Sequence, residues 1–455
     1  MALVYDKASS LQADGHRNYV HPADVSGRYD RVRQVAFAVL LVVFAGLPWL
    51  QIGGHPAVFL DVLHRRFYLF GGTFNAQDFW LVFFLLTGVG YGLFVVTSLW
   101  GRVWCGYACP QTVFLEGVFR PIERWLEGPR NVRMRRNAGP WNRDKVLRKG
   151  AKHLIYVVLS FLVAHVVLSY FVSLPGLYAM VLSDPAAHPE AFVWAISLTG
   201  VIYFVFSWFR EQVCLIVCPY GRLQSVMTDR DTLVIGYDSN RGEPRGKASA
   251  KQAGDCVDCK RCVVVCPTGI DIRNGLQIDC IGCARCIDAC DEVMVKLRRP
   301  TGLVRYDSSR GLAGEERRPM WRPRLWFYAV LGVVGTLVLS FALARQAAYE
   351  ANVLRLPGPP YTVADGQVRN GFQIHIINKS GETAKYHIQP GGEGGVTMVV
   401  AMPELELASF GSQMVPVFVT FPEGTVADGT RVSISLKQGD EAEPRRLMLP
   451  LAAPH

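Results

Sequence analysis

The chain has 455 residues, of which half are hydrophobic and 19% are charged, and its net charge is +10. This apolar excess is unusual for a soluble protein. The positive charge does not indicate nucleic acid, because residues 345–455 carry nine Lys/Arg against eleven Asp/Glu and the excess lies beside the apolar runs of the first 344 residues. A basic membrane face explains this distribution, so we expect membrane lipid as a partner and no nucleic acid.

The chain begins with a polar segment, residues 1–33, that lacks the pattern of a signal peptide. Beyond it, five uncharged runs reach the roughly 20 apolar residues that a bilayer-crossing helix needs. They cover about 34–52, 79–100, 153–174, 191–209 and 325–344. We therefore predict a transmembrane bundle of about five helices, in which residues 34–209 form a four-helix region and 325–344 form the fifth helix.

Loop charge predicts the orientation of the bundle. Residues 101–152 carry twelve Lys/Arg against four acids, residues 174–190 carry neither Lys nor Arg, and residues 210–324 carry about twenty Lys/Arg. We therefore expect the N-terminus, the loop 101–152 and the region 210–324 in the cytoplasm, with residues 345–455 outside.

Two C-x3-C-P motifs each follow a predicted span: Cys105 with Cys109, and Cys214 with Cys218. On a continuing helix, residues i and i+4 share a face, and the following proline tends to end or kink the helix. Each pair would then present two sulfurs near the membrane surface. Four soft thiolates at one depth could bind Cu(I), hold a further cluster or cycle as dithiols.

His165 falls within the third predicted span. An ionisable group at this depth is a functional hypothesis. Packing with a hydrogen bond is the interpretation that we favour over contact with a quinone or a metal, because no second histidine lies mid-membrane.

A double cysteine repeat follows at about 250–300. Two runs have the spacing C-x2-C-x2-C-x3-C, which is typical of bacterial ferredoxins with two [4Fe–4S] clusters. In this pattern three cysteines of a run hold one cluster and the fourth holds the other. The prediction assigns one cluster to Cys256, Cys259, Cys262 and Cys290, and the second to Cys280, Cys283, Cys286 and Cys266. Paired zinc sites are the alternative, but these usually separate two cysteine pairs by a longer loop.

The tail, residues 345–455, contains about seven short alternating runs separated by Gly-, Pro- and Asp-rich stretches. This pattern predicts an all-β sandwich of immunoglobulin type. The tail contains no cysteine, so its fold does not depend on a disulfide. The triplet that starts at Asn378 matches a glycosylation sequon, and we give it no weight.

The runs GRVWCGYACPQTVF, EQVCLIVCPYGRLQS and CPTGIDIRNGLQIDCIGCARCIDACD together resemble the CcoG family, also called FixG or RdxA. The resemblance covers most of the chain and implies a multi-pass protein of the bacterial inner membrane. It implies an inserted α+β dicluster ferredoxin domain that faces the cytoplasm and an immunoglobulin-like periplasmic domain.

The resemblance also implies a function: reduction of Cu(II) to Cu(I) for assembly of a cbb-type cytochrome c oxidase. Copper handling would then fall to Cys105, Cys109, Cys214 and Cys218, next to two [4Fe–4S] clusters. Expected partners are a cytoplasmic electron donor, copper-handling and oxidase assembly proteins, and a second copy of the chain. Two other functions stay open, namely a quinol-linked electron-transfer subunit and a non-redox assembly scaffold.

Overall fold

The computed structural model describes residues 19–52, 54–62, 66–75, 79–249, 252–316, 323–344, 348–380, 382–391, 395–439 and 444–454. Most of the predicted N-terminal segment, up to residue 18, lies outside the described residues. The chain divides into two compact units, Met1–Gly71 with Trp80–Gly335, and Gly72–Phe79 with Thr336–His455. Each unit is described by itself below.

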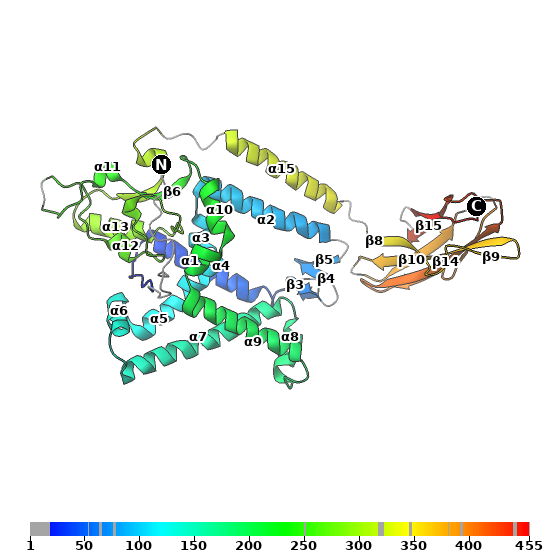
Figure 1. Ribbon diagram of the computed structural model, residues 1–455, viewed down its shortest axis with the longest axis horizontal. Coiled ribbons are helices and arrows are strands. Elements are labelled where there is room, and N and C mark those ends of the chain that lie inside the picture. The colour runs from blue at the N-terminus through cyan, green and yellow to red at the C-terminus, as the bar shows by residue number, and fades with distance from the viewer. Residues whose placement is uncertain are drawn as a thin grey trace. The chain divides into compact units, whose positions relative to one another are not determined.

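Within the described residues, four helices are long and apolar enough to cross a membrane. They are Leu81–Trp100 within α2(Phe79–Trp100), α7(Arg143–Ser169), α9(Pro189–Phe204) with its π-helical continuation η3(Val205–Phe209), and α15(Pro323–Ala344). Helices α7 and α9 pack side by side (Figure 1). Helix α2 contacts the first half of α15, where the rings of Phe94 and Tyr328 meet edge to face at 5.0 Å. Most side chains of these helices are exposed, as lipid-facing helices require.

The bounds of the first predicted span, residues 34–52, are wrong. The helix in this region is α1(Arg28–Gly46), which begins six residues earlier and ends six residues earlier. Its first turn contacts the region of the cysteine repeat, because the backbone N–H of Asp30 donates to Asp288 Oδ2 at 2.8 Å. The uncharged part, residues 34–46, is about 20 Å long, which is shorter than the roughly 30 Å hydrocarbon core of a bilayer.

The segment 101–152, which we expected to be a loop, is mostly helical. It contains α3(Val103–Tyr107), α4(Pro110–Phe114), η2(Leu115–Phe119), α5(Arg120–Glu127) and α6(Arg130–Ala138). Helix α7 then begins ten residues before the predicted span at 153, because Asn142 caps it by accepting from the backbone N–H of Lys145 at 2.8 Å. Its charged first turns therefore continue the helix beyond the apolar stretch.

Shorter elements join the spans of the first unit. They are β1(Gln51–Ile52), β2(His55–Pro56), β3(Val58–Asp61), β4(Arg66–Leu69), α8(Leu174–Leu182), η4(Val213–Val217) and α10(Pro219–Met227). Strand β1 pairs with β2, and β3 with β4, both antiparallel. Helix α8 starts after Ser173, whose side chain caps it.

The cysteine repeat lies in a small α+β region between two strands that are distant in sequence, β6(Leu233–Tyr237) and β7(Val304–Ser308), which pair antiparallel. Between them lie α11(Ser239–Gly242), α12(Arg261–Val264), η5(Ile272–Asn274) and α13(Arg285–Lys296), and α14(Ser309–Leu312) follows β7. Its core joins Ile235 and Tyr237 of β6 to Ile287 and Met294 of α13.

The second unit contains two antiparallel sheets (Figure 1). The strands of these two sheets are β8(Tyr349–Arg355), β9(Thr362–Ala364), β10(Gln367–Asn378), β11(Ala384–Pro390), β12(Thr397–Val400), β13(Glu404–Leu407), β14(Ser412–Pro422), β15(Arg431–Gln438) and β16(Arg445–Pro450). The unit also contains the short strand β5(Gly72–Asn75), which belongs to neither sheet. One sheet has the order β12-β14-β10-β8, with β9 also paired to β10, and the other β13-β11-β15-β16. The predicted immunoglobulin-like sandwich is confirmed.

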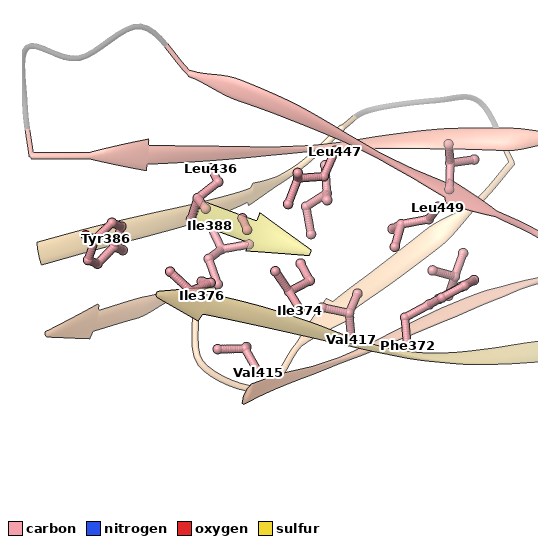
Figure 2. Close-up of a cluster of buried hydrophobic side chains, with 14 of the residues drawn as sticks. Phe372, Ile374, Ile376, Tyr386, Ile388, Val415, Val417, Leu436, Leu447 and Leu449 are labelled. Atoms are coloured by element: carbon pink, nitrogen blue, oxygen red, sulfur yellow. The ribbon is translucent and has the colours of Figure 1, made fainter. Parts of the chain in front are cut away.

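Alternation along each strand builds the core of this sandwich. Figure 2 shows side chains of both sheets in one cluster, among them Phe372 and Ile374 of β10 and Leu436 of β15. Asn378, the first residue of the sequon, is fully buried, and its amide donates to the backbone oxygen of Glu382 at 2.7 Å. The folded domain therefore offers this side chain no access for a glycan.

Candidate metal centres

The first cysteine cavity is lined by four cysteines: Cys256, Cys259, Cys262 and Cys290. Three come from the first run and one from the end of the second run, on α13. The other lining side chains are mostly apolar, including Met294 and Leu303.

A second cavity is lined by Cys266, Cys280, Cys283 and Cys286, and Cys262 reaches it as well. Here three cysteines come from the second run and Cys266 comes from the first. The structure therefore groups the eight cysteines crosswise, three from one run with the fourth of the other.

Matching backbone turns in the two runs explain this grouping. Asp258 and Lys260 have positive φ in the first run, and Gly282 and Ala284 occupy the equivalent positions in the second run with positive φ. These left-handed residues curl the chain around the cysteines, and a helix begins directly after Lys260 and after Ala284. Cys290 lies on α13 and Cys266 lies two residues after the end of α12, so the fourth cysteine of each run lines the other cavity.

Burial governs the ionisation of these thiols. It raises the pKa of Cys262, Cys280 and Cys290 to about 12, and it raises the pKa of Cys286 as well. Iron binding must displace these protons and would compensate the buried thiolate charge. Four thiols around a mostly apolar cavity therefore fit an iron–sulfur cluster, whose sulfur ligands are thiolates.

The two C-x3-C-P motifs correct one prediction, since the first helix does not continue through either motif. Cys105 lies in α3 and Cys214 in η4, whereas Cys109 and Cys218 are in extended conformations, with ψ of 126° and 111°. A proline disfavours the helical conformation in the residue before it. It also suits the first position of a helix, so Pro110 and Pro219 start α4 and α10 rather than end a helix.

The structure brings the four cysteines of these motifs together. Burial and the charges of the neighbouring Cys109, Cys105 and Cys218 together raise the pKa of the Cys214 thiol to about 12. Burial also raises the pKa of Cys105 to about 11. We name Cys105, Cys109, Cys214 and Cys218 the four-thiol site.

Hydrogen bonds cross between the two motifs. Gln224 of α10 donates from Nε2 to Cys105 Sγ at 3.2 Å, and Arg102 donates from Nη2 to the backbone oxygen of Gly221 at 2.9 Å. Gln111 of α4 donates to the backbone oxygen of Arg210 at 2.9 Å. These contacts hold the end of each span against the cysteine motif of the other.

The four-thiol site also touches the second cysteine cavity through bare backbone. A Cβ at Gly106 would lie 2.8 Å from the backbone oxygen of Gly282 and 2.9 Å from the Cα of Cys283. Arg102 reinforces this contact by donating to the backbone oxygen of Cys280 at 3.1 Å. Gly106, which follows Cys105, therefore lies in direct van der Waals contact with Gly282 and Cys283.

A buried ionic cluster lies next to the second C-x3-C-P motif and to the end of the first ferredoxin run. Arg120 of α5 contacts Glu211 and donates to the backbone oxygen of Pro267, both at 3.1 Å, and Pro267 directly follows Cys266. Glu123, one turn further along α5, contacts Arg210 and Arg133. One short helix thus positions both the approach to Cys214 and the end of the first ferredoxin run.

Within the described residues, no three His, Cys, Asp or Glu side chains lie close enough to share one metal ion. This spacing suits a cubane in the two cysteine cavities, because a cubane spreads its thiolates over separate irons. At the four-thiol site the same spacing leaves at most two thiolates for any one copper ion. His165 donates from Nδ1 to the backbone oxygen of Phe161 in its own helix at 2.8 Å, which matches the packing interpretation.

Sequence reasoning missed Arg102, Gln224 and the ionic cluster of α5, because no spacing rule marks a residue that acts across a tertiary contact. Gly106 could have been identified from the sequence as a site of close packing. A glycine inside a short cysteine motif indicates a close backbone approach.

Comparison with known proteins gives the same division of the chain. A 4Fe-4S dicluster domain matches residues 209–309, a 4Fe-4S binding domain matches 81–130, and the IG-like fold at the C-terminal of FixG matches 339–447. The chain is similar to a crystal structure of a FixG-related protein from Vibrio parahaemolyticus, with 14% identity over 24% of this chain and 98% of that one, and a TM-score of 0.21.

Two curated relatives extend over nearly the whole chain. Protein RdxA of Cereibacter sphaeroides is 35% identical, with 94% of this chain and 95% of the relative covered. Nitrogen fixation protein FixG of Rhizobium meliloti is 38% identical, with 90% and 88% covered. The chain therefore belongs to the FixG/RdxA family of membrane iron–sulfur redox proteins.

Proposed function

We propose that this chain reduces Cu(II) to Cu(I) at the four-thiol site, for assembly of a copper-containing cbb-type cytochrome c oxidase. In this proposal Cys256, Cys259, Cys262 and Cys290 hold one [4Fe–4S] cluster, and Cys280, Cys283, Cys286 and Cys266 hold the other. The clusters, when bound, would supply electrons one at a time, which matches the single electron that Cu(II) needs.

One observation carries the proposal: Gly106 of the first C-x3-C-P motif packs directly on Gly282 and Cys283. Cys283 belongs to the four cysteines assigned to the second cavity, which we call the second tetrad; those of the first cavity are the first tetrad. Electron transfer to copper requires the thiols that bind copper to lie next to an electron source, and this contact supplies that proximity. Soft thiolates also favour Cu(I) over harder oxygen ligands. The chain's own part is to hold copper beside the second tetrad.

The orientation in this proposal follows from charge. Helices α5 and α6, with their basic residues, lie in the same connection between α2 and α7 as the first cysteine motif, and basic segments stay in the cytoplasm. A cytoplasmic donor would then deliver electrons to the tetrads. The immunoglobulin-like domain would lie in the periplasm, where it would dock copper-handling or oxidase assembly proteins.

Purified, anaerobically reduced protein should convert Cu(II) to Cu(I), detected with a Cu(I)-specific chromogenic chelator. Cys105→Ser and Cys214→Ser should lower the rate at least tenfold while the iron and sulfide content stays unchanged. Cys→Ser variants that keep both the clusters and the full rate would exclude the four-thiol site as the place of reduction. Reoxidation by quinone, but not by Cu(II), would favour the quinol-linked function instead.

A second use of the four-thiol site is favoured by one observation. The 4Fe-4S binding domain that matches residues 81–130 includes, of the twelve cysteines, only Cys105 and Cys109. With Cys214 and Cys218 these complete a set of four thiols, enough for a third cluster. Loss of about four irons per chain in Cys105→Ser would support this alternative.

A further inference from the structure

A cavity of about 400 Å³ lies between α1, the start of α5 and the first turn of α13, and contains no cysteine. Five arginines line it, namely Arg33, Arg120, Arg124, Arg133 and Arg285, against three acids, Asp24, Asp30 and Glu116. The lining therefore carries an excess of two positive charges. We name this cavity the arginine pocket.

Three of its guanidinium groups are buried and incompletely paired. Arg33 is 2% exposed, Arg120 6% and Arg133 3%. In the part of the chain that the structure describes, Arg33 Nη2, Arg120 Nε and Arg133 Nε have no hydrogen-bond partner. Leaving a buried N–H of a charged group without an acceptor is costly. An anion in the pocket would supply the missing acceptors.

The acids already have partners in the pocket wall. Glu116 contacts Arg120, and it contacts Arg285 at 3.3 Å. Asp30 contacts Arg285 at 3.4 Å. The residual demand for negative charge therefore falls on Arg33, which has no carboxylate within ion-pair distance among the described residues. Planar guanidinium groups bind the oxygens of phosphate especially well.

One wall of the pocket is apolar. Phe37, Ala38 and Leu41 of α1 line it, one to two helical turns after Arg33. Beyond them, Val39 and Val42 of the same helix are exposed. The charged wall, the apolar wall and the exposed apolar side chains of α1 would together suit a ligand that joins a phosphate to an alkyl chain.

We propose that the arginine pocket binds a phosphate group through Arg33, Arg120 and Arg133. The phosphate comes either from the headgroup of an acidic phospholipid or from a soluble phosphate compound. The site adjoins the redox centres, because Arg33 donates from Nε to the backbone oxygen of Gly106 at 3.0 Å. Arg285, in the opposite wall, directly precedes Cys286. This inference does not depend on copper reduction.

The test uses the full chain, with bound phospholipid counted by native mass spectrometry and inorganic phosphate measured by calorimetry in phosphate-free detergent. Wild-type protein should retain phosphatidylglycerol over phosphatidylcholine if the source is lipid, or bind inorganic phosphate if it is soluble. Arg33→Gln should weaken the observed binding at least tenfold. Arg230→Gln should leave it unchanged, because Arg230 is an exposed arginine that pairs with Glu315 outside the pocket.

A second variant keeps every guanidinium group and guards against misfolding of Arg33→Gln. Ala38→Trp narrows the apolar wall, so it should weaken phosphatidylglycerol binding while leaving inorganic phosphate binding intact. Wild-type protein that retains neither ligand would overturn the proposal, and so would equal affinity in wild type, Arg33→Gln and Ala38→Trp.

Discussion

At the scale of single residues, two glycines determine how closely the thiol sites approach. Gly106 faces Gly282, and a Cβ on either one would meet backbone atoms of the facing segment at 2.8 Å. Backbone cannot yield as a flexible side chain does. The absence of two side chains therefore allows the contact on which the proposed electron route depends.

Gly106→Ala should separate the four-thiol site from the second tetrad. Overpacking of this kind typically costs about 1–3 kcal/mol, so we expect a lower thermal unfolding midpoint and slower copper reduction. Gly150→Ala is the matched control, because a Cβ there meets nothing within 4 Å. An unchanged reduction rate in Gly106→Ala, with normal iron content, would show that the close contact does not matter.

His21 predicts a pH dependence of stability. Burial lowers its pKa to about 4, although Glu123 opposes the shift, whereas an unfolded histidine titrates near 6.5. Between these values the unfolded state binds more protons, so stability falls as the pH drops from about 6.5 to 4. The unfolding midpoint should fall less steeply over this range in His21→Gln than in wild type. Parallel curves would rule out His21 as a source of the acid sensitivity.

At the scale of elements, the C-P turn is the repeated device. Each motif follows a span and a residue with positive φ, Gly101 or Arg210. The first cysteine then lies in a short helical turn, and the proline starts a new helix. This arrangement turns the chain back on itself within a few residues, so both cysteines of a motif stay near the end of their span.

The ionic cluster of α5 should be the most sensitive polar contact between elements. Burial by itself would raise the pKa of Glu123. The charges of Arg210 and Lys152 outweigh burial and hold the pKa well below its usual range, so the carboxyl is ionised. Glu123→Gln would leave buried cations without their partner, which typically costs about 3–5 kcal/mol. The thermal unfolding midpoint in detergent measures this loss.

Glu315→Gln is the control for Glu123→Gln, because its partner Arg230 is exposed and such surface pairs contribute about 0–1 kcal/mol. Equal effects of the two substitutions would mean that the α5 cluster does not hold the elements together.

At the scale of the whole molecule, the iron count distinguishes the two uses of the four-thiol site. Two cubanes predict about eight irons per chain. Anaerobically purified protein should therefore give about eight irons and eight labile sulfides by elemental and sulfide assays. Twelve of each would move the four-thiol site from copper to a third cluster, and zinc in place of iron would refute the cluster assignment.

Local sequence patterns predicted much of this architecture. Helices α2 and α15 match the predicted spans 79–100 and 325–344 closely, because an uninterrupted apolar run of bilayer length has few other stable solutions. Cysteine spacing predicted which cysteines share a cavity, since short links keep three cysteines of a run together and the repeated pattern assigns the fourth to the other run. Alternation in the tail predicted a β-sandwich, because long strands such as β10, β14 and β15 bury one face.

The sequence by itself determined four of the membrane spans, the cysteine groups and the class of the C-terminal domain, because apolar runs, repeated cysteine spacings and alternation can all be read along the chain. Only the tertiary structure decided that α1 is too short in its apolar part, that Gly106 meets Gly282, and that arginines of α1, α5, α6 and α13 line one pocket. These features depend on contacts between residues that are far apart in sequence, and no local pattern records such contacts.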